Sequence, residues 1–374
     1  MRMRRSLGVA LLGAALITGA CSSSGGTATT SPAAQPSASA EGSAAASASG
    51  SAAIKNPKVG FVVPLISNPY WKLIQDFAQG AAGTLGVDLQ TGQADSDETK
   101  QINIIEGMIA SGVDGLVVGP VSDKVGDTVL KDAEAANIPV VFMQRSPGVK
   151  PADYQGKQYI GYVGTADVDG GTTAAQTLYD AGARKWVAMT GSQGNSVAED
   201  RLKAAQDFVK AHSDVTLLDS QYGNEARDAG QKTMENFLSA YPGPGFDGTY
   251  SFNDEGALGA IQALKNANVL DKVKVSAIDG TTDAVNSVAA GDLLVTVGGG
   301  YACGAFALVE LFDYINGHPP KDREVLIPLV AVTKDNAKAY QDQVLNGMST
   351  YDFKAVSQVY TPGASTDDYG ITLK

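Results

Sequence analysis

Short apolar segments alternate with amphipathic segments of helical length along most of the chain. Apolar residues recur three and four positions apart in segments such as Trp71–Leu85, Lys100–Ser111 and Val197–Ala211, a spacing that predicts helices with one buried face. Near-continuous apolar strands separated by helices are typical of parallel sheets that are covered on both faces, so the sequence predicts an α/β fold. The predicted strands are Val59–Val63, Val87–Gln90, Gly115–Val118, Pro139–Phe142, Tyr159–Val163, Trp186–Met189, Thr216–Asp219, Gly248–Phe252, Val273–Ile278 and Leu293–Val297.

The number of strands favours two lobes, because ten strands would make an unusually large single sheet. The segment Gly161–Ala166 is one candidate crossing between lobes, and Gly298–Gly300, where backbone freedom is greatest, is another. A helix over Tyr301–Ile315 and a strand through Ile327–Val330 would then take the chain across a third time. We expect two doubly wound parallel-sheet lobes, joined by a three-stranded hinge, with a ligand cleft where the carboxyl ends of their strands face one another. The predicted lobes are 54–164 with 300–328, and 165–299 with 329–374.

The first 21 residues resemble a bacterial lipoprotein signal. Arg2, Arg4 and Arg5 form a basic start. The apolar run Leu7–Ile17 that follows has the length of a signal-peptide core and is too short to span a bilayer. Small residues then precede Cys21, the residue that such signals present for lipidation. We expect a lipid on Cys21 to anchor the protein outside the cytoplasm; a plain secretory signal with an incidental cysteine is the alternative.

A segment of low complexity, 22–53, separates this signal from the rest of the chain. All but four of its residues are Ser, Ala, Gly or Thr. Such a composition cannot bury enough apolar surface to offset the entropy lost on ordering, so we expect a disordered, flexible tether.

Composition excludes several classes of function. The net charge of −12 at pH 7 repels phosphate backbones, so we expect no nucleic-acid partner. Two cysteines exclude a disulfide scaffold and a cysteine-ligated metal, and two histidines leave little material for histidine catalysis or a multi-histidine metal site. The acidic run Asp95–Glu98 favours a helix N-terminus over a cation site. Because phosphate-binding loops and nucleophile elbows are also absent from the sequence, we expect no cofactor, no metal and no catalysis.

Four motifs, spread over some 220 residues in the same order, resemble one family. They are Val59–Trp71, Ile138–Arg145, Ser251–Ala260 and Val275–Thr281. Together they resemble the periplasmic sugar-binding proteins of ABC transporters, of the ribose-binding type. The resemblance implies the type I periplasmic binding protein fold, a ligand enclosed by hinge closure, and delivery to a membrane permease. LacI-type repressors share this fold, but they begin with a basic helix-turn-helix where this chain has its signal.

In the predicted first lobe, the resemblance implies a ligand-binding role for five residues. Asn68 would bind ligand hydroxyls, although its place before Pro69 also suits a helix N-cap. Tyr70 and Trp71 would stack on the apolar face of a sugar, although two adjacent aromatics can also be core. The remaining two are Gln144, where the family usually has aspartate, and Arg145, whose planar fork suits paired oxygens unless it forms a surface ion pair.

In the predicted second lobe, the resemblance implies that Arg201, Asn253 and Asp279 reach the ligand. Arg201 is badly spaced for an ion pair with Glu199 or Asp200 on its own helix. Asn253 ends a strand, and Asp254 beside it is a candidate helix cap. Asp279 would accept hydroxyls, although Asp279-Gly280 can also be only a turn.

Two departures in this lobe favour a ligand other than a standard pyranose. Glu225 stands near the place where family members often have an aromatic residue. A glutamine common at the final hinge is replaced within Gly298–Gly300.

We therefore predict a solute-binding lipoprotein that captures a small neutral carbohydrate or polyol and delivers it to an ABC permease. We expect it to act as a monomer. A sensor of the same fold, signalling to a histidine kinase or chemoreceptor, is the competing interpretation, and a hydrolase that uses cleft carboxylates is a distant one.

Overall fold

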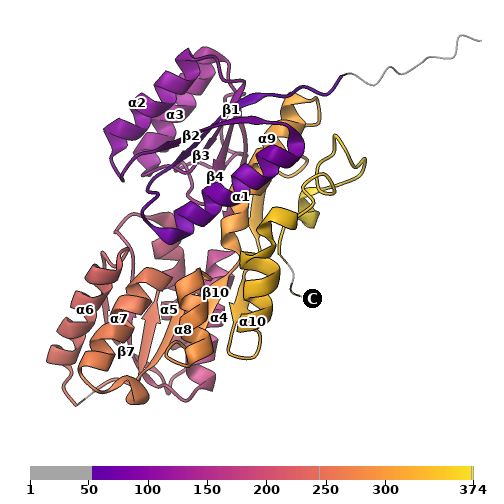
Figure 1. Cartoon of the computed structure of the whole chain (residues 1–374). Coiled ribbons are helices and arrows are strands. Elements are labelled where there is room, and N and C mark those ends of the chain that lie inside the picture. The colour runs from indigo at the N-terminus through magenta and orange to yellow at the C-terminus, as the bar shows by residue number, and fades with distance from the viewer. Residues whose placement is uncertain (1–52, 244, 372, 374) are drawn as a thin grey trace, which may run out of the picture. The chain divides into compact units, whose positions relative to one another are not determined.

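The computed structural model describes residues 53–371 except 244, together with residue 373 (Figure 1). These residues belong to one compact unit that begins at Ala53. The predicted signal peptide, Cys21 and the tether up to residue 52 lie outside the described residues.

The first lobe is built on a parallel sheet with the strand order β11-β5-β4-β3-β1-β2. Helices α1 and α9 pack together on one face of this sheet, and α2 and α3 cover the other (Figure 1). The strands are β1 Lys58–Val63, β2 Asp88–Gln93, β3 Gly115–Val118, β4 Val140–Met143, β5 Tyr159–Thr165 and β11 Glu324–Ile327. The helices are α1 Pro69–Leu85, α2 Glu98–Ala110, α3 Asp123–Ala136 and α9 Cys303–Ile315.

The second lobe has the same plan, with the strand order β12-β10-β9-β8-β6-β7. All its strand pairs are parallel except β12 with β10. The strands are β6 Lys185–Met189, β7 Thr216–Gln221, β8 Gly248–Ser251, β9 Lys274–Asp279, β10 Val295–Gly298 and β12 Val330–Val332. The helices are α4 Asp167–Asp180, α5 Ser196–Ala211, α6 Arg227–Ala240, α7 Asp254–Asn266 and α8 Thr282–Ala290.

The predicted fold class is confirmed, since each of the ten predicted strands is present and they divide between two six-stranded sheets. The expected helix start at Asp95–Glu98 is confirmed as well, because the side chain of Asp97 caps α2.

One detail of the predicted strands was wrong. The predicted strand through Ile327–Val330 is two short strands, because β11 pairs with β5 in the first sheet and β12 pairs with β10 in the second. Pro328, which has no N–H to donate, stands between them.

The chain crosses between the lobes where predicted. It passes from β5 into α4 after Thr165, and from β10 into α9 through the glycines at 298–300. The third crossing is the Pro328–Leu329 step between β11 and β12. At Gly298 a Cβ would lie 2.3 Å from the Tyr340 hydroxyl oxygen, so the close approach of this tyrosine requires glycine there.

The predicted division assigns residues 329–374 to the second lobe, but only the first part of this segment packs there. Helix α10 (Ala337–Tyr340) contacts α8 of the second lobe. Farther on, however, the ring of Tyr369 stacks on Phe306 of α9 at 4.6 Å, and the Ser357 hydroxyl donates to Asp313 of the same helix. The segment therefore returns to the first lobe, because α9 presents aromatic and acidic side chains on which it packs.

Helix α9 also buries a carboxyl group that has no partner. Glu310 is 2% exposed, and neither of its carboxylate oxygens has a hydrogen-bond partner. Burial raises the pKa of Glu310 to about 8, although Arg323 partly opposes this. The folded state thus holds a proton that the unfolded chain loses at the usual glutamate pKa of about 4.3.

We expect the stability of the protein to fall as pH rises from about 5 to 8, by up to about tenfold in the unfolding equilibrium constant per pH unit. Glu310→Gln should reduce this slope by the contribution of Glu310, up to about tenfold per pH unit, because its amide is neutral throughout; Asp279, whose pKa burial also raises to about 8, keeps its own contribution. Urea denaturation at several pH values measures it, with the exposed Glu106→Gln as the matched control. An equal slope in wild type and Glu310→Gln would contradict the assignment.

Candidate functional site

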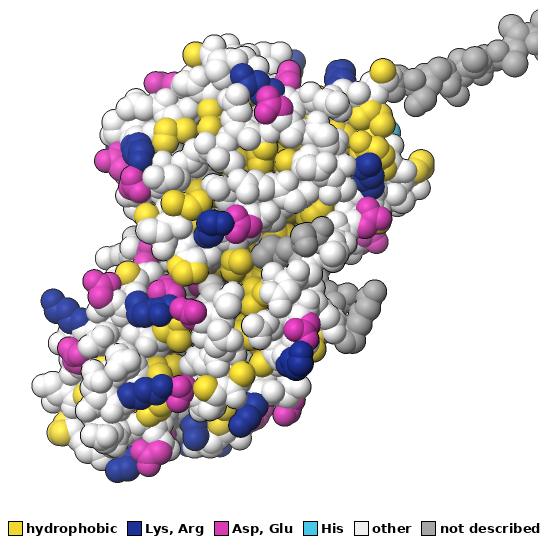
Figure 2. All heavy atoms as spheres, viewed as in Figure 1, with side chains coloured by type: hydrophobic (Ala, Val, Ile, Leu, Met, Phe, Trp, Pro, Cys, Tyr) yellow, Lys and Arg dark blue, Asp and Glu magenta, His cyan; other side chains and the backbone are white. Residues whose placement is uncertain are grey.

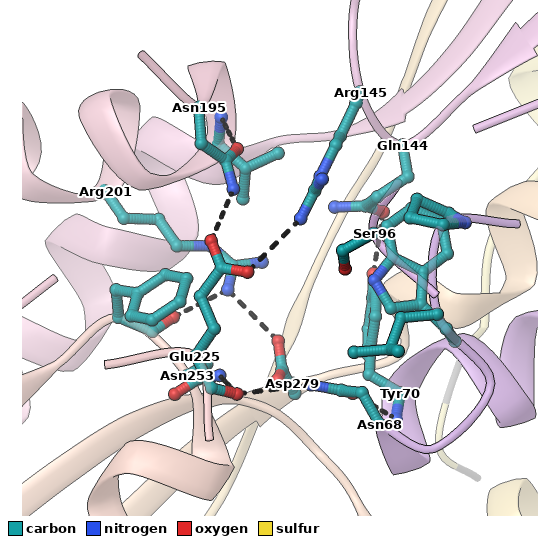
Figure 3. Close-up of a pocket in the computed structure, with 15 residues that line it drawn as sticks. Asn68, Tyr70, Ser96, Gln144, Arg145, Asn195, Arg201, Glu225, Asn253 and Asp279 are labelled. Atoms are coloured by element: carbon teal, nitrogen blue, oxygen red, sulfur yellow. Dashed lines mark hydrogen bonds and ion pairs between the residues drawn. The ribbon is translucent and has the colours of Figure 1, made fainter. Parts of the chain in front are cut away.

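Strand ends and helix starts of both lobes line one cavity with an empty volume of about 520 Å³, its mouth included (Figure 3). The structure brings together in its wall every residue that the sequence predicted for the ligand site. These residues are Asn68, Tyr70, Trp71, Gln144, Arg145, Arg201, Glu225, Asn253 and Asp279. Their clustering at the carboxyl ends of the strands is the placement that open α/β sheets give to binding sites.

The start of α1 supplies the aromatic wall. Asn68 caps this helix, because its side-chain oxygen accepts from the Tyr70 N–H at 2.9 Å. Pro69 occupies the first turn, where its missing N–H costs nothing. The cap orients Tyr70 and Trp71 so that both rings line the cavity, although each is only 6% exposed. The sequence had offered a helix cap as the alternative role of Asn68 and the core as the alternative place of Tyr70 and Trp71. The structure shows both, since Asn68 caps α1 and the two rings belong to the core cluster.

Arg145 lies against this wall. Its guanidinium carbon is 5.3 Å from the centre of a Trp71 ring, within the range of a cation–π contact, and its Nη1 donates to the Val121 carbonyl at 3.3 Å. Burial lowers the pKa of Arg145, and Glu225 partly opposes this. The residue is no surface ion pair, because its side chain is 16% exposed and faces the cavity.

Gln144 is engaged inside the protein. Its Oε1 accepts from the Tyr70 hydroxyl at 2.7 Å, and its Nε2 donates to Thr165 Oγ1 at 3.2 Å. The backbone at Gln144 is left-handed, with φ of 61°, a conformation that costs energy for a residue other than glycine. The neutral amide thus suits an interior position between a tyrosine hydroxyl and a threonine hydroxyl, beside the cavity.

Arg201 is a buried cation on the second-lobe side of the cavity. It is 2% exposed; its Nε donates to Asp167 at 2.7 Å, and its Nη1 donates to Asp279 at 3.1 Å and to the Phe252 carbonyl at 2.6 Å. Burial lowers the pKa of Arg201, but Asp167 and Asp279 outweigh burial and hold it above its usual value. The pair with Glu199 or Asp200 is not formed, as the helix spacing predicted.

Asp279 combines burial with a strained backbone. It ends β9 with φ of 143°, a region that residues other than glycine rarely adopt. Burial raises the pKa of Asp279 to about 8, and Arg201 only partly offsets this. Such strain is retained where the surrounding structure fixes a side chain, and here it aims a carboxyl group into the cavity (Figure 3).

The turn from β8 to α7 differs from the expectation that Asp254 caps the helix. Asn253, not Asp254, caps α7, because its side-chain oxygen accepts from the Gly256 N–H at 2.9 Å. Asp254 is buried instead and accepts from Thr281 and Thr296. Asn253 therefore combines helix capping with a place in the cavity wall.

Glu225 joins the two lobes. Its carboxylate Oε1 accepts from the Ser192 N–H at 3.0 Å, and its Oε2 lies 3.8 Å from Arg145 Nη2 of the first lobe. Its carbonyl accepts from the side-chain amides of Asn68 and Asn253. Burial raises the pKa of Glu225, but Arg145 and the donated hydrogen bonds outweigh burial, so the net shift is downward and the group is ionised.

Sequence reasoning missed several wall residues. Asn195 caps α5 and donates to Glu225, and Phe252 and Ser96 line the cavity. Asp167, which does not line this cavity but pairs with Arg201, is the most consequential omission. A sequence signal for Asp167 was available, since it opens α4 directly after the predicted crossing at Gly161–Ala166, and α4 packs against α5, the helix that carries Arg201.

Within the described residues, no group of three His, Cys, Asp or Glu side chains is arranged to hold a metal ion. In the same part of the chain, the helices are too short or too polar to cross a membrane.

Two α/β lobes with a polar and aromatic cavity between their strand ends define a two-lobed solute-binding protein. The chain belongs to the periplasmic binding protein domain family, which it matches over residues 59–318.

Known proteins agree with this assignment. A protein of Rhizobium meliloti named as rhizopine-binding is 32% identical over 289 residues, covering 76% of this chain and 92% of that protein. The ribose import binding protein RbsB of Escherichia coli is 30% identical, covering 66% of this chain and 80% of that protein. Among solved structures, the periplasmic binding protein of the Shewanella arabinose ABC transporter, bound to L-arabinofuranose, superposes with a TM-score of 0.72 at 26% identity, covering 79% of this chain and 98% of that one.

Proposed function

We propose that this protein is the solute-binding component of an ABC importer and captures a small neutral sugar or polyol in the interlobe cavity. The observation that carries the proposal is the composition of that cavity. Trp71 and Tyr70 offer flat apolar surface for C–H groups, while Arg145, Asn253 and Asp279 offer polar groups for the hydroxyl edge. Sugars and linear polyols present both kinds of surface, and the relatives named for ribose and arabinose support the assignment.

Hinge closure would couple binding to delivery. The three crossings are the covalent links between the lobes, and the cavity wall has residues from both. A ligand that contacts both lobes stabilises the closed state only, and the permease would recognise that state. The protein itself would release its ligand chemically unchanged.

A thermal-shift screen tests the ligand class. Pentoses, hexoses, linear polyols and cyclitols are compared with purine nucleosides and amino acids. Ligand at a hundredfold excess over its dissociation constant adds about 2.7 kcal/mol to the free energy of unfolding, which raises the midpoint by a few degrees in a body of this size. We expect shifts with sugars or polyols only. A shift with nucleosides or amino acids and none with carbohydrates would contradict the proposed function.

We also propose that a lipid on Cys21 holds the protein at the outer surface of the cell membrane. The proposal rests on the sequence of the first 21 residues and on the periplasmic binding protein family. Cys21→Ser should move the protein from the membrane fraction into the soluble extracytoplasmic fraction, which fractionation and immunoblotting measure. Cys303→Ser is the matched control, because that cysteine is buried in α9. Membrane retention of Cys21→Ser would contradict lipid anchoring.

A further inference from the structure

The cavity contains two arginines, yet both are paired with carboxylates, so the site is unfavourable for an acidic ligand. Arg201 is already paired with Asp167 and Asp279, both buried. Arg145 is paired with Glu225 from the opposite lobe. Three carboxylates thus face two guanidinium groups, and protonation of Asp279 would leave the site neutral, with no excess of positive charge.

Glu225 compensates the positive charge of Arg145, the arginine that is more exposed at the cavity. Among the described residues, the ion pair recorded for Arg145 is the one with Glu225, whose side chain is 32% exposed at the cavity. In Figure 3 the two side chains point toward one another across the centre of the site. The glutamate is held in this direction by the Ser192 N–H and by Asn195 Nδ2, which donate to its other oxygen.

Without Glu225, Arg145 would be a planar cation at the edge of a largely buried cavity, backed by Trp71. That is the arrangement that binds carboxylates best, because the guanidinium fork matches two carboxylate oxygens. With Glu225 present, a ligand carboxylate that approaches Arg145 meets a fixed, ionised like charge at close range. Specificity of this kind comes from the repulsive element as much as from the attractive one.

We propose that Glu225 is a specificity-determining residue that makes the cavity accept neutral sugars and polyols and reject their acids, the aldonates and uronates. The proposal rests on the proposed function, since it concerns which members of the carbohydrate class the same site binds.

The experiment is calorimetric titration with three matched pairs: ribitol and ribonate, xylitol and xylonate, and galactose and galacturonate. In the wild-type protein we expect the acid of any binding pair to be on the order of 100-fold weaker than the neutral compound. Glu225→Gln should reduce this ratio to about tenfold or less, chiefly by tighter binding of the acid to Arg145. The substitution keeps an amide oxygen that can accept from Ser192 and Asn195, so the loop is expected to remain folded.

Glu199→Gln is the matched control. Glu199 also accepts a backbone N–H of the same loop, that of Gly194, but it does not line the cavity. Its substitution should leave the neutral-to-acid ratio unchanged. Equal affinity of the wild type for an acid and its neutral partner would overturn the inference, as would an unchanged ratio in Glu225→Gln. If none of the six compounds binds and the screen finds no carbohydrate, the proposed function fails and the inference fails with it.

Discussion

Arg201→Ala is expected to lower the free energy of unfolding by about 3–5 kcal/mol, the largest effect of any single substitution considered. Arg201 is 2% exposed and neutralises two carboxylates, Asp167 and Asp279, that are themselves buried. Its loss leaves both without a cation in a region of low dielectric. It also removes the donor to the Phe252 carbonyl, which joins α5 to the end of β8.

Urea denaturation of the ligand-free protein measures this effect. Arg227→Ala is the control, because Arg227 also pairs with two carboxylates, Glu255 and Asp283, but its side chain is 46% exposed. Solvent screens that pair of bridges, so the control should change stability by about 1 kcal/mol or less. Equal losses in the two variants would mean that burial of the Arg201 cluster is not what makes it important.

Arg145→Ala is expected to weaken ligand binding on the order of 100-fold while the protein remains folded. The guanidinium lies on Trp71 at the cavity and donates to ligand oxygens in the proposed function, and hydrogen bonds to charged groups contribute about 1.5–3 kcal/mol each. The fold depends less on Arg145 than on Arg201, because within the described residues its side chain donates one hydrogen bond, to the Val121 carbonyl, and its ion pair with Glu225 is longer, at 3.8 Å.

Calorimetric titration with the best ligand of the screen, together with a thermal melt of the variant, separates affinity from folding. Arg184→Ala is a close match, since Arg184 also stacks on an aromatic ring, Tyr179 at 3.8 Å, and pairs with one carboxylate, Asp214, away from the cavity. This control should bind ligand normally. An unchanged dissociation constant in Arg145→Ala would remove Arg145 from the site.

The arrangement of the fold was predictable because its signals are local. Apolar runs of four to six residues separated by amphipathic helices define parallel strands whatever the distant contacts are, so all ten strands were found. The errors occurred where distant contacts decide. Pro328 divides one apolar run between two sheets, and the aromatic residues after Tyr340 return to α9 because Phe306 and Phe312 are available there.

The prediction of the site shows the same contrast between local signals and distant contacts. Strand ends placed all nine candidate residues in one cavity, since the carboxyl ends of parallel strands meet at the same edge. The partners of these residues were not predictable from spacing. Gln144 accepts from Tyr70 and donates to Thr165, and Arg201 of α5 pairs with Asp167 of α4 in the same lobe, because side-chain pairing depends on how neighbouring elements pack.

Figure 2 shows basic and acidic side chains interspersed over this face of both lobes, without a large patch of one sign. At the cavity, Arg145 is paired with Glu225, and Arg201 is paired with Asp167 and Asp279. This distribution agrees with recognition inside the cavity by hydrogen bonds and stacking.

A crystal structure of the protein grown with the carbohydrate that gives the largest thermal shift tests the central claim most directly. The account predicts one ligand molecule in the interlobe cavity, stacked on Trp71 and within hydrogen-bond distance of Arg145, Asn253 and Asp279. Ligand bound elsewhere on the protein, with the cavity occupied by water alone, would contradict it.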